Sequence, residues 1–423
     1  MNILGIKSFQ ILLLFIFGII AIVGLLVFAS ARTGGERVEQ VGTVVIWGLL
    51  PEQAVRDTIR SHGGAYRDVT YREITPEEFH TTYTQALALS RGPDIILVSQ
   101  EFLRAEYETL SLISETAYTP RDFEASFVGA ADVLRAQGGY FGLPVAIDPL
   151  VMFYNRPLLD QARVPEPPRY WEQFFGLAPR LSVVEQGFAL SQSMVALGSY
   201  NNIAHAKRVI SALFFQTGTP IVDSSWRAVL AERPQGREAP AESALRFYTE
   251  FANPSKASYS WNAGMPQDRR QFLEGKLALY FAPASEGPLL REANPNLNFA
   301  PAPFPQLEGQ APVVYADLYF AGLVHSTRNP QGARSVLFTM AGEGFGRRLA
   351  EASGVTPVAR STLGRVQTDP LRDIAYEAAL IARTWASPQP SQVANAFSAM
   401  VGGVVSGQRT VREALEDVAR ALR

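Results

Sequence analysis

The apolar residues of the chain gather in short continuous runs, separated by longer amphipathic stretches. The runs at residues 43–47 and 94–98 are rich in β-branched residues, and each predicts a buried strand because it is short and bounded by turn residues. Residues 69–74 predict a second strand between them. The stretches between them begin at Pro51 and Pro76 and are followed by glycines, as is typical of helices. Strands that alternate with helices predict an α/β fold, with helices on both faces of a parallel sheet.

The order of these elements also indicates where a ligand would bind. In sheets of this kind, ligands bind outside the carboxyl ends of the strands. This rule points to the residues just after Trp47, just after Val98 and around Asp148. Asp148-Pro149 separates two apolar runs at 145–147 and 150–155. We interpret these runs as one strand that leaves a first lobe and another that enters a second.

The remaining chain continues the mixture of helices and strands. Residues 277–281 and 313–325 predict strands, and the proline-rich segment 300–305 predicts an extended chain. Helices are predicted around residues 201–217, 241–252, 268–275, 330–341, 345–353, 373–384 and 391–406. Thr410 and Glu413 have the spacing of a capping box and predict the start of the last helix.

The N-terminal segment differs from everything that follows it. Residues 8–31 carry no charge, and residues 11–28 are long and apolar enough to cross a bilayer as a helix. We therefore predict a single transmembrane anchor over residues 8–31, followed by a short polar tether and a soluble unit that begins near Val41. The triplet Ala29-Ser30-Ala31 also fits a signal cleavage site, so cleavage after Ala31 remains an alternative. The charges on either side of the segment do not set its orientation.

Composition narrows the possible functions. Hydrophobic residues make up 47% and charged residues 18% of the 423 residues, as in a globular chain of two or three domains. The formal net charge of −2 gives no sign of a nucleic-acid partner. The chain contains no cysteine, which excludes disulfides, thiolate nucleophiles, thiolate metal sites and a lipid-modified cysteine. Its four histidines lack the spacing of metal ligands, so we expect neither a metal nor a cofactor.

Searches for catalytic and nucleotide-binding motifs give no match. The glycines of 342–346 are followed by two arginines where a dinucleotide-binding turn needs a glycine. No phosphate-binding loop, nucleophile elbow or H-E-x-x-H zinc motif is present. Two distant carboxylates could still form a hydrolase site, and Asp148 and Glu101 are the residues considered for that role.

Five segments together resemble one known family. They are residues 92–96, residues 142–148 running into 153–159, residues 272–280, residues 329–338 and residues 406–415. In this order they resemble the family 1 extracellular solute-binding proteins of the maltodextrin-binding type. The resemblance covers residues 41–423.

The resemblance implies a periplasmic-binding-protein-like clamp of two discontinuous lobes. Lobe one would comprise residues 41–147 and 308–353, and lobe two residues 148–307 and 354–423. Such a clamp closes around a small polar solute and docks on the permease subunits of an ABC importer, without catalysing a reaction. We therefore expect a monomeric bacterial binding protein at the cell membrane, with its soluble part on the extracytoplasmic side.

The resemblance and the local patterns together select candidate ligand contacts. Asp148 and Glu101 fall where the family has acidic contacts, and Trp47 and Trp261 lie where an aromatic platform would stand. Trp47 could equally belong to the core, and Glu101 could equally be a solvated helix acid. The candidates added by local pattern are Asn202, which could instead cap a helix, Asp317 on a strand face, and Trp385 in an irregular stretch.

Several positions depart from the maltodextrin-binding pattern. Leu50-Pro51 replaces the Asp-Lys that follows the first strand, Val98 replaces an aromatic residue, and residues 282–286 replace Gly-Pro-Trp. Much of the sugar-stacking wall is therefore missing, and we expect a carbohydrate-like solute smaller than a long maltodextrin. A membrane-tethered sensor or scaffold with the same clamp is the alternative function.

Overall fold

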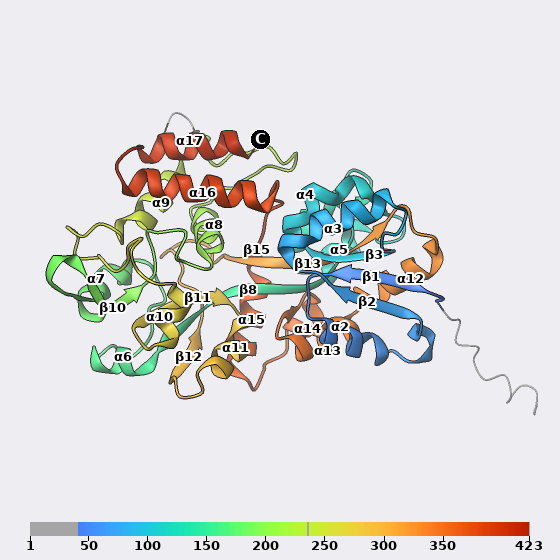
Figure 1. The fold of residues 1–423 in the computed structure, drawn as a ribbon, viewed down its shortest axis with the longest axis horizontal. Coiled ribbons are helices and arrows are strands. Elements are labelled where there is room, and N and C mark those ends of the chain that lie inside the picture. Colours follow the sequence, from blue (N-terminus) through green and yellow to red (C-terminus); the bar gives the residue numbers. More distant parts are fainter. Residues whose placement is uncertain (1–40, 235–236, 423) are drawn as a thin grey trace, which may run out of the picture. The chain divides into compact units, whose positions relative to one another are not determined.

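The computed structural model describes residues 41–234 and 237–422, and the strand–helix alternation expected at the start of this part is confirmed (Figure 1). The first elements are β1 (Val44–Gly48), α2 (Glu52–Arg60), β2 (Val69–Glu73), α3 (Pro76–Ala88) and β3 (Ile95–Ser99). β1 pairs in parallel with both β2 and β3. Four consecutive residues of β3, from Ile95 to Val98, have no exposed surface, as a strand covered on both faces requires.

The chain then forms a second group of elements around this sheet. These are α4 (Leu103–Glu106), β4 (Leu110–Ser111), β5 (Ile113–Ser114), α5 (Pro120–Ser126), β6 (Arg135–Ala136), β7 (Gly139–Tyr140), β13 (Val314–Val324), α12 (Pro330–Met340) and α13 (Glu343–Ser353). β13 pairs antiparallel with β3, so the sheet is mixed. Figure 1 shows α3 and α4 on one side of the strands and α2 and α13 on the other.

A second lobe is built around other strands of the same sheet. Its strands are β9 (Val183–Val184), β10 (Leu190–Val195), β11 (Leu277–Pro283) and β12 (Phe299–Ala302). Its helices are α6 (Arg156–Gln161), α7 (Glu172–Leu181), α8 (Ala206–Gln216), α9 (Pro240–Glu250), α10 (Asp268–Leu273) and α11 (Glu286–Ala293). The elements after β14 (Thr356–Pro357) are α14 (Arg360–Leu363), α15 (Pro370–Leu380), β15 (Ala382–Arg383), α16 (Pro390–Val405) and α17 (Val411–Ala421).

One long strand connects the two lobes. β8 (Leu143–Asn155) pairs with β13 through residues 143–149 and with β11 and β12 through residues 150–155. The sheet therefore runs β2-β1-β3-β13-β8-β11-β10-β9 across both lobes. The change of partner falls inside 146–150, where we expect the chain to cross between lobes. The full lobe limits given above stay a prediction.

One local expectation was wrong, and one strand was missed. We interpreted Asp148-Pro149 as a break between strands, but β8 continues through it. Pro149 fits because it lacks only a donor, and its carbonyl oxygen accepts from the backbone N–H of Ala284 at 3.0 Å. β10 was missed because its first half is partly exposed and polar, so it contains no continuous apolar run.

No helix within the described residues is long and apolar enough to cross a bilayer. The anchor expected over residues 8–31 and the cleavage point after Ala31 lie outside the described residues.

Candidate functional site between the lobes

Two carboxylates lie side by side at the crossing between the lobes. Asp148 on β8 and Asp317 on β13 are paired directly opposite each other in the antiparallel ladder. Opposed residues of neighbouring strands project from the same face of a sheet. Both residues are buried, with 4% and 3% exposed surface. Buried charges need partners, and the two carboxylates have very different ones.

Asp148 is held by a single residue of lobe two. Its two oxygens accept from the backbone N–H of Ser285 at 3.1 Å and from the Ser285 hydroxyl at 2.5 Å. Burial raises the pKa of Asp148 to about 7, because the bonds from Ser285 offset the loss of water only in part and the neighbouring Asp317 adds repulsion. Asp148 is therefore partly protonated near neutral pH.

This raised pKa predicts that the contribution of Asp148 to stability decreases as the pH rises. The folded protein binds a proton at Asp148 more tightly than the unfolded chain does, so this contribution is present below about pH 4 and is lost as the pH rises to about 7. Asp148→Asn, which mimics the neutral acid, should gain at least about 1.4 kcal/mol relative to wild type over that range, the free energy of one pKa unit. Urea unfolding at a series of pH values measures this difference. The exposed Asp160→Asn is the control, and a parallel pH profile for wild type and Asp148→Asn would contradict the assignment.

Asp317, in contrast, is a paired anion. Its Oδ2 accepts from Nε of Arg208 at 2.6 Å, and its Oδ1 accepts from the Tyr315 hydroxyl at 3.1 Å. The amide of Gln100 donates to the same Oδ1 at 3.4 Å and to the Tyr315 hydroxyl at 3.0 Å. Burial by itself would raise the pKa of Asp317, but the Arg208 guanidinium outweighs it and the net shift is downward.

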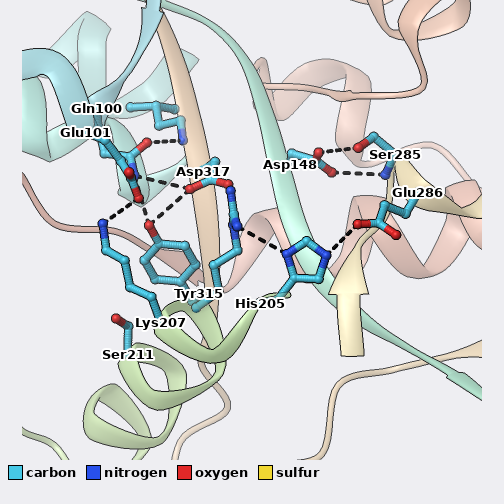
Figure 2. Close-up of polar contacts among 12 residues, drawn as sticks. Gln100, Glu101, Asp148, His205, Lys207, Ser211, Ser285, Glu286, Tyr315 and Asp317 are labelled. Atoms are coloured by element: carbon cyan, nitrogen blue, oxygen red, sulfur yellow. Dashed lines mark hydrogen bonds and ion pairs between the residues drawn. The ribbon is translucent and has the colours of Figure 1, made fainter. Parts of the chain in front are cut away.

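A second ion pair crosses directly from one lobe to the other. Glu101 follows β3 in lobe one, and Lys207 lies in the first turn of α8 in lobe two. Their charged atoms are 2.5 Å apart, and their side chains retain only 18% and 13% of their exposed surface. Figure 2 shows this pair beside Asp317 and Tyr315. The Lys207 ammonium also lies 5.1 Å from the centre of the Trp385 ring, in cation–π contact.

The network continues into lobe two through a histidine. Arg208 donates from Nη1 to Nδ1 of His205 at 3.1 Å, which assigns the ring hydrogen to Nε2. That nitrogen contacts Oε1 of Glu286 at 2.5 Å (Figure 2). Glu286 also accepts from the Tyr280 hydroxyl at 3.0 Å. Arg208 is thereby held from both sides and cannot turn away from Asp317 without breaking its hydrogen bond to His205.

A cavity of about 550 Å³ lies next to these groups, and we call it the cleft cavity. Its walls come from the segment after β1, from the crossing strands and from lobe two. They include Leu49, Leu50, Pro51, Asp148, Tyr319, Ser285, Leu289, Thr356, Arg372 and Tyr376. Gly48 allows the chain to turn into this wall, because a Cβ there would lie 2.4 Å from the carbonyl oxygen of Leu97.

The polar groups of the cleft cavity are available to a ligand. Thr356 and Tyr376 have little exposed surface, 2% and 7%, and both line the cavity. Hydroxyls that converge on a cavity can donate to and accept from a ligand. The leucines and Pro51 supply apolar contact on the lobe-one side and the rim.

The structure brings together three of the seven residues expected from the sequence. Glu101, Asp148 and Asp317 converge at the crossing, although only Asp148 lines the cleft cavity. Trp385 adjoins them through Lys207 and donates from its indole N–H to the Ser211 hydroxyl at 3.2 Å. Glu101 is a partly buried ion-pair partner in this structure and not a solvated acid.

The other three expected residues pack elsewhere. Trp47 is 8% exposed, with the Arg72 guanidinium 5.1 Å from the centre of its ring. Trp261 is completely buried and donates from its indole N–H to the side-chain oxygen of Asn202 at 3.2 Å. Asn202 does not cap α8, whose N-cap residue is His205. Ligand contact by these residues stays a prediction, and here they serve packing.

The sequence analysis did not select the basic residues of the site. His205, Lys207 and Arg208 lie at the start of α8, where the positive end of the helix dipole disfavours cations. Two basic residues in a first turn therefore indicate partners from elsewhere in the fold, and this was the available signal. Ser285 and Glu286 carried no comparable signal.

Comparisons with known proteins agree with the geometry. Residues 65–344, more than half of the chain, match the family model described as bacterial extracellular solute-binding protein. The cyclic α-maltosyl-1,6-maltose binding protein from Arthrobacter globiformis is 15% identical, with a TM-score of 0.72 over 90% of this chain and 97% of that one.

Two further solved structures show the same fold. An ABC substrate-binding protein from Listeria monocytogenes, in complex with cycloalternan, is 13% identical, with a TM-score of 0.68 over 90% of this chain and 98% of that one. An ABC transporter solute-binding protein from Thermotoga lettingae, bound with α-D-tagatose, is 17% identical, with a TM-score of 0.67 over 90% and 100% of the two chains.

Proposed function

Because this chain belongs to the bacterial extracellular solute-binding proteins, we propose that it captures a small carbohydrate-like solute between its two lobes for an ABC importer. Members of this family bind solutes and are not enzymes, so the hydrolase hypothesis is set aside. We further propose that the lobes have the limits expected from the sequence, and that residues 8–31 hold the binding unit at the outer face of the membrane.

The cleft cavity carries this proposal. Its volume falls within the range of about 300–1,000 Å³ that is typical of small-molecule sites. The hydroxyls of Tyr376 and Thr356, the guanidinium of Arg372 and the partly protonated Asp148 offer both donors and acceptors. Sugar hydroxyls also donate and accept, so a polyol can satisfy this mixture better than a purely anionic or cationic solute.

The walls of the cavity also support a short solute. No tryptophan is among the described residues that line it, and the apolar contacts come from Leu49, Leu50, Pro51 and Leu289. Tyr319 and Tyr376 are the aromatic side chains among these lining residues, so few aromatic faces are offered to successive sugar rings. The bound ligands of the similar structures, α-D-tagatose and cycloalternan, belong to those proteins and do not by themselves select a size here.

A panel of solutes tests the function. We expect a thermal-shift screen of the full chain to give its largest shift with a mono- or disaccharide, since a ligand at about 100 times its Kd adds about 2.7 kcal/mol of stability. The panel contains sugars, polyols, amino acids, polyamines and phosphate esters. Tyr376→Phe should weaken binding about two- to tenfold through the loss of one hydrogen bond, and the exposed Tyr170→Phe serves as the control.

The same screen separates the rival functions. If an amino acid or a polyamine gave the largest thermal shift of the panel, the carbohydrate assignment would be contradicted. A membrane-tethered sensor or scaffold is the second candidate, and one observation favours it: the Trp226 ring of lobe two already packs 5.0 Å from the Tyr107 ring of lobe one. A panel without any shift would support that candidate.

A further inference from the structure

Two cavities lie between the lobes. Besides the cleft cavity, a second cavity of about 730 Å³ is lined by Asp132 and Val133 of lobe one, by Trp226 of lobe two, and by Val313 and Trp385. Each alone has the volume of a small-molecule site. Joined, they would form one long groove that could hold a chain of several sugar rings.

Strand β13 shows what separates these cavities. Val313, just before the strand, lines the second cavity, and Tyr319 lines the cleft cavity. Between these residues the strand carries Tyr315 and Asp317 on the same face as Tyr319. Asp317 holds Arg208, and Lys207 lies between Glu101 and the Trp385 ring. We infer from this order that the ion pairs Glu101–Lys207 and Arg208–Asp317 lie between the cavities, and we call them the charged partition.

We propose that the charged partition determines the length of the solute. It confines the ligand to the cleft cavity, so that the site takes one or two sugar rings and excludes longer chains. This inference rests on the proposed carbohydrate function and adds a size limit to it. Glu101 and Lys207 are the specificity-determining pair, because their bond links the two lobes directly beside the Trp385 ring.

The strength of the charged partition follows from its burial. A longer neutral chain would have to part Glu101 from Lys207 and leave both charges with hydroxyl partners alone. The two charges would then lose their mutual Coulomb attraction in a site that water reaches poorly, so the exchange is unfavourable. Arg208 cannot move aside, since Asp317 and His205 hold it from both ends.

Removal of the pair should lengthen the site. The double variant Glu101→Ala with Lys207→Ala deletes both charges together and leaves neither one buried without a partner. It also uncovers the face of Trp385, which becomes available for stacking on an additional sugar ring. The site would then reach from the cleft cavity towards the second cavity.

The experiment is a titration of wild type and double variant with two ladders of linear sugars. The probes are glucose, maltose, maltotriose and maltotetraose, and mannose, mannobiose and mannotriose. In the wild type we expect affinity to stop rising at the disaccharide. In the double variant we expect the longer sugars to bind at least about tenfold more tightly than in the wild type, with little change for the short ones.

Matched controls accompany the titration. Arg270→Ala with Glu274→Ala removes an exposed ion pair of 2.7 Å on lobe two and should leave the length profile unchanged. Glu101→Ser with Lys207→Ser frees most of the same volume and keeps hydroxyls for hydrogen bonds, so it replaces the alanine variant if that variant does not fold. Circular dichroism and the unfolding midpoint check the folding of each variant.

The outcomes distinguish this inference from the proposed function. A wild type that binds the trisaccharides more tightly than the disaccharides would overturn the length limit, as would a double variant with the wild-type profile. A wild type that binds no sugar, either here or in the solute panel, would overturn the carbohydrate function and the length limit with it.

Discussion

Asp317→Ala should lower the free energy of unfolding by about 3 kcal/mol, because it leaves the Arg208 charge without its partner in a mostly buried site. The side chain of Asp317 is 4% exposed and that of Arg208 is 30% exposed. The partial exposure of Arg208 places the expected loss at the lower end of the range for broken buried pairs. Tyr315 and Gln100 lose an acceptor at the same time, which adds to the cost.

Urea unfolding at pH 7 measures this loss, and a double-mutant cycle shows its cause. Arg208→Met on the Asp317→Ala background removes the unpaired charge and should restore part of the stability. The surface pair Asp417–Arg420 provides the control, since Asp417→Ala should cost less than about 1 kcal/mol. If Asp317→Ala lost as little stability as Asp417→Ala, water would have to solvate Arg208, and the pair would not anchor the crossing.

Trp261→Ala should cost about 3–5 kcal/mol, the usual range for truncation of a buried Trp or Phe. The ring has no exposed surface, and its indole N–H bonds to Asn202. That asparagine in turn donates to the backbone carbonyls of Asn262 and Met265, both at 2.9 Å, so the damage extends to the 258–265 loop. Solute affinity should change less than about twofold in the fraction that remains folded, because Trp261 does not line the cleft cavity.

Two readouts on the same variants decide between packing and ligand contact for Trp261. Unfolding midpoints report stability, and titration with the best solute of the panel reports affinity. Trp261→Phe keeps an aromatic ring and loses the hydrogen bond, so its stability should fall between those of the wild type and the alanine variant. A large loss of affinity at nearly unchanged stability would restore Trp261 as a stacking platform.

Local patterns predicted most of the elements of this fold. β1 and β3 were evident because strands buried on both faces must be short and apolar, whereas β2 alternates buried and exposed residues in its first half. α3 and α12 were evident from Pro76 and Pro330 at their first positions, which need no N–H donor, but α5, which also begins with proline, was not predicted. β10 and the continuity of β8 through Pro149 were not, since pairing with a distant strand decides both and leaves no local pattern.

The sequence likewise predicted some residues of the candidate site and not others. The rule that ligands bind at strand ends, together with the family resemblance, placed Asp148 and Glu101 at the crossing. The partners of these residues come from Lys207 and Ser285, which lie more than 100 residues away along the chain. No spacing within the sequence relates such pairs.

The sequence by itself determined the α/β class, the strand ends that face the other lobe and the absence of thiol chemistry, because these depend on neighbouring residues or on composition. Only the tertiary structure decided which carboxylate is paired and which is partly protonated. Asp148 and Asp317 are the same residue type on adjacent strands, and they differ because one faces Ser285 and the other faces Arg208. The free energy of a buried charge depends on what surrounds it in space, and sequence order does not specify those surroundings.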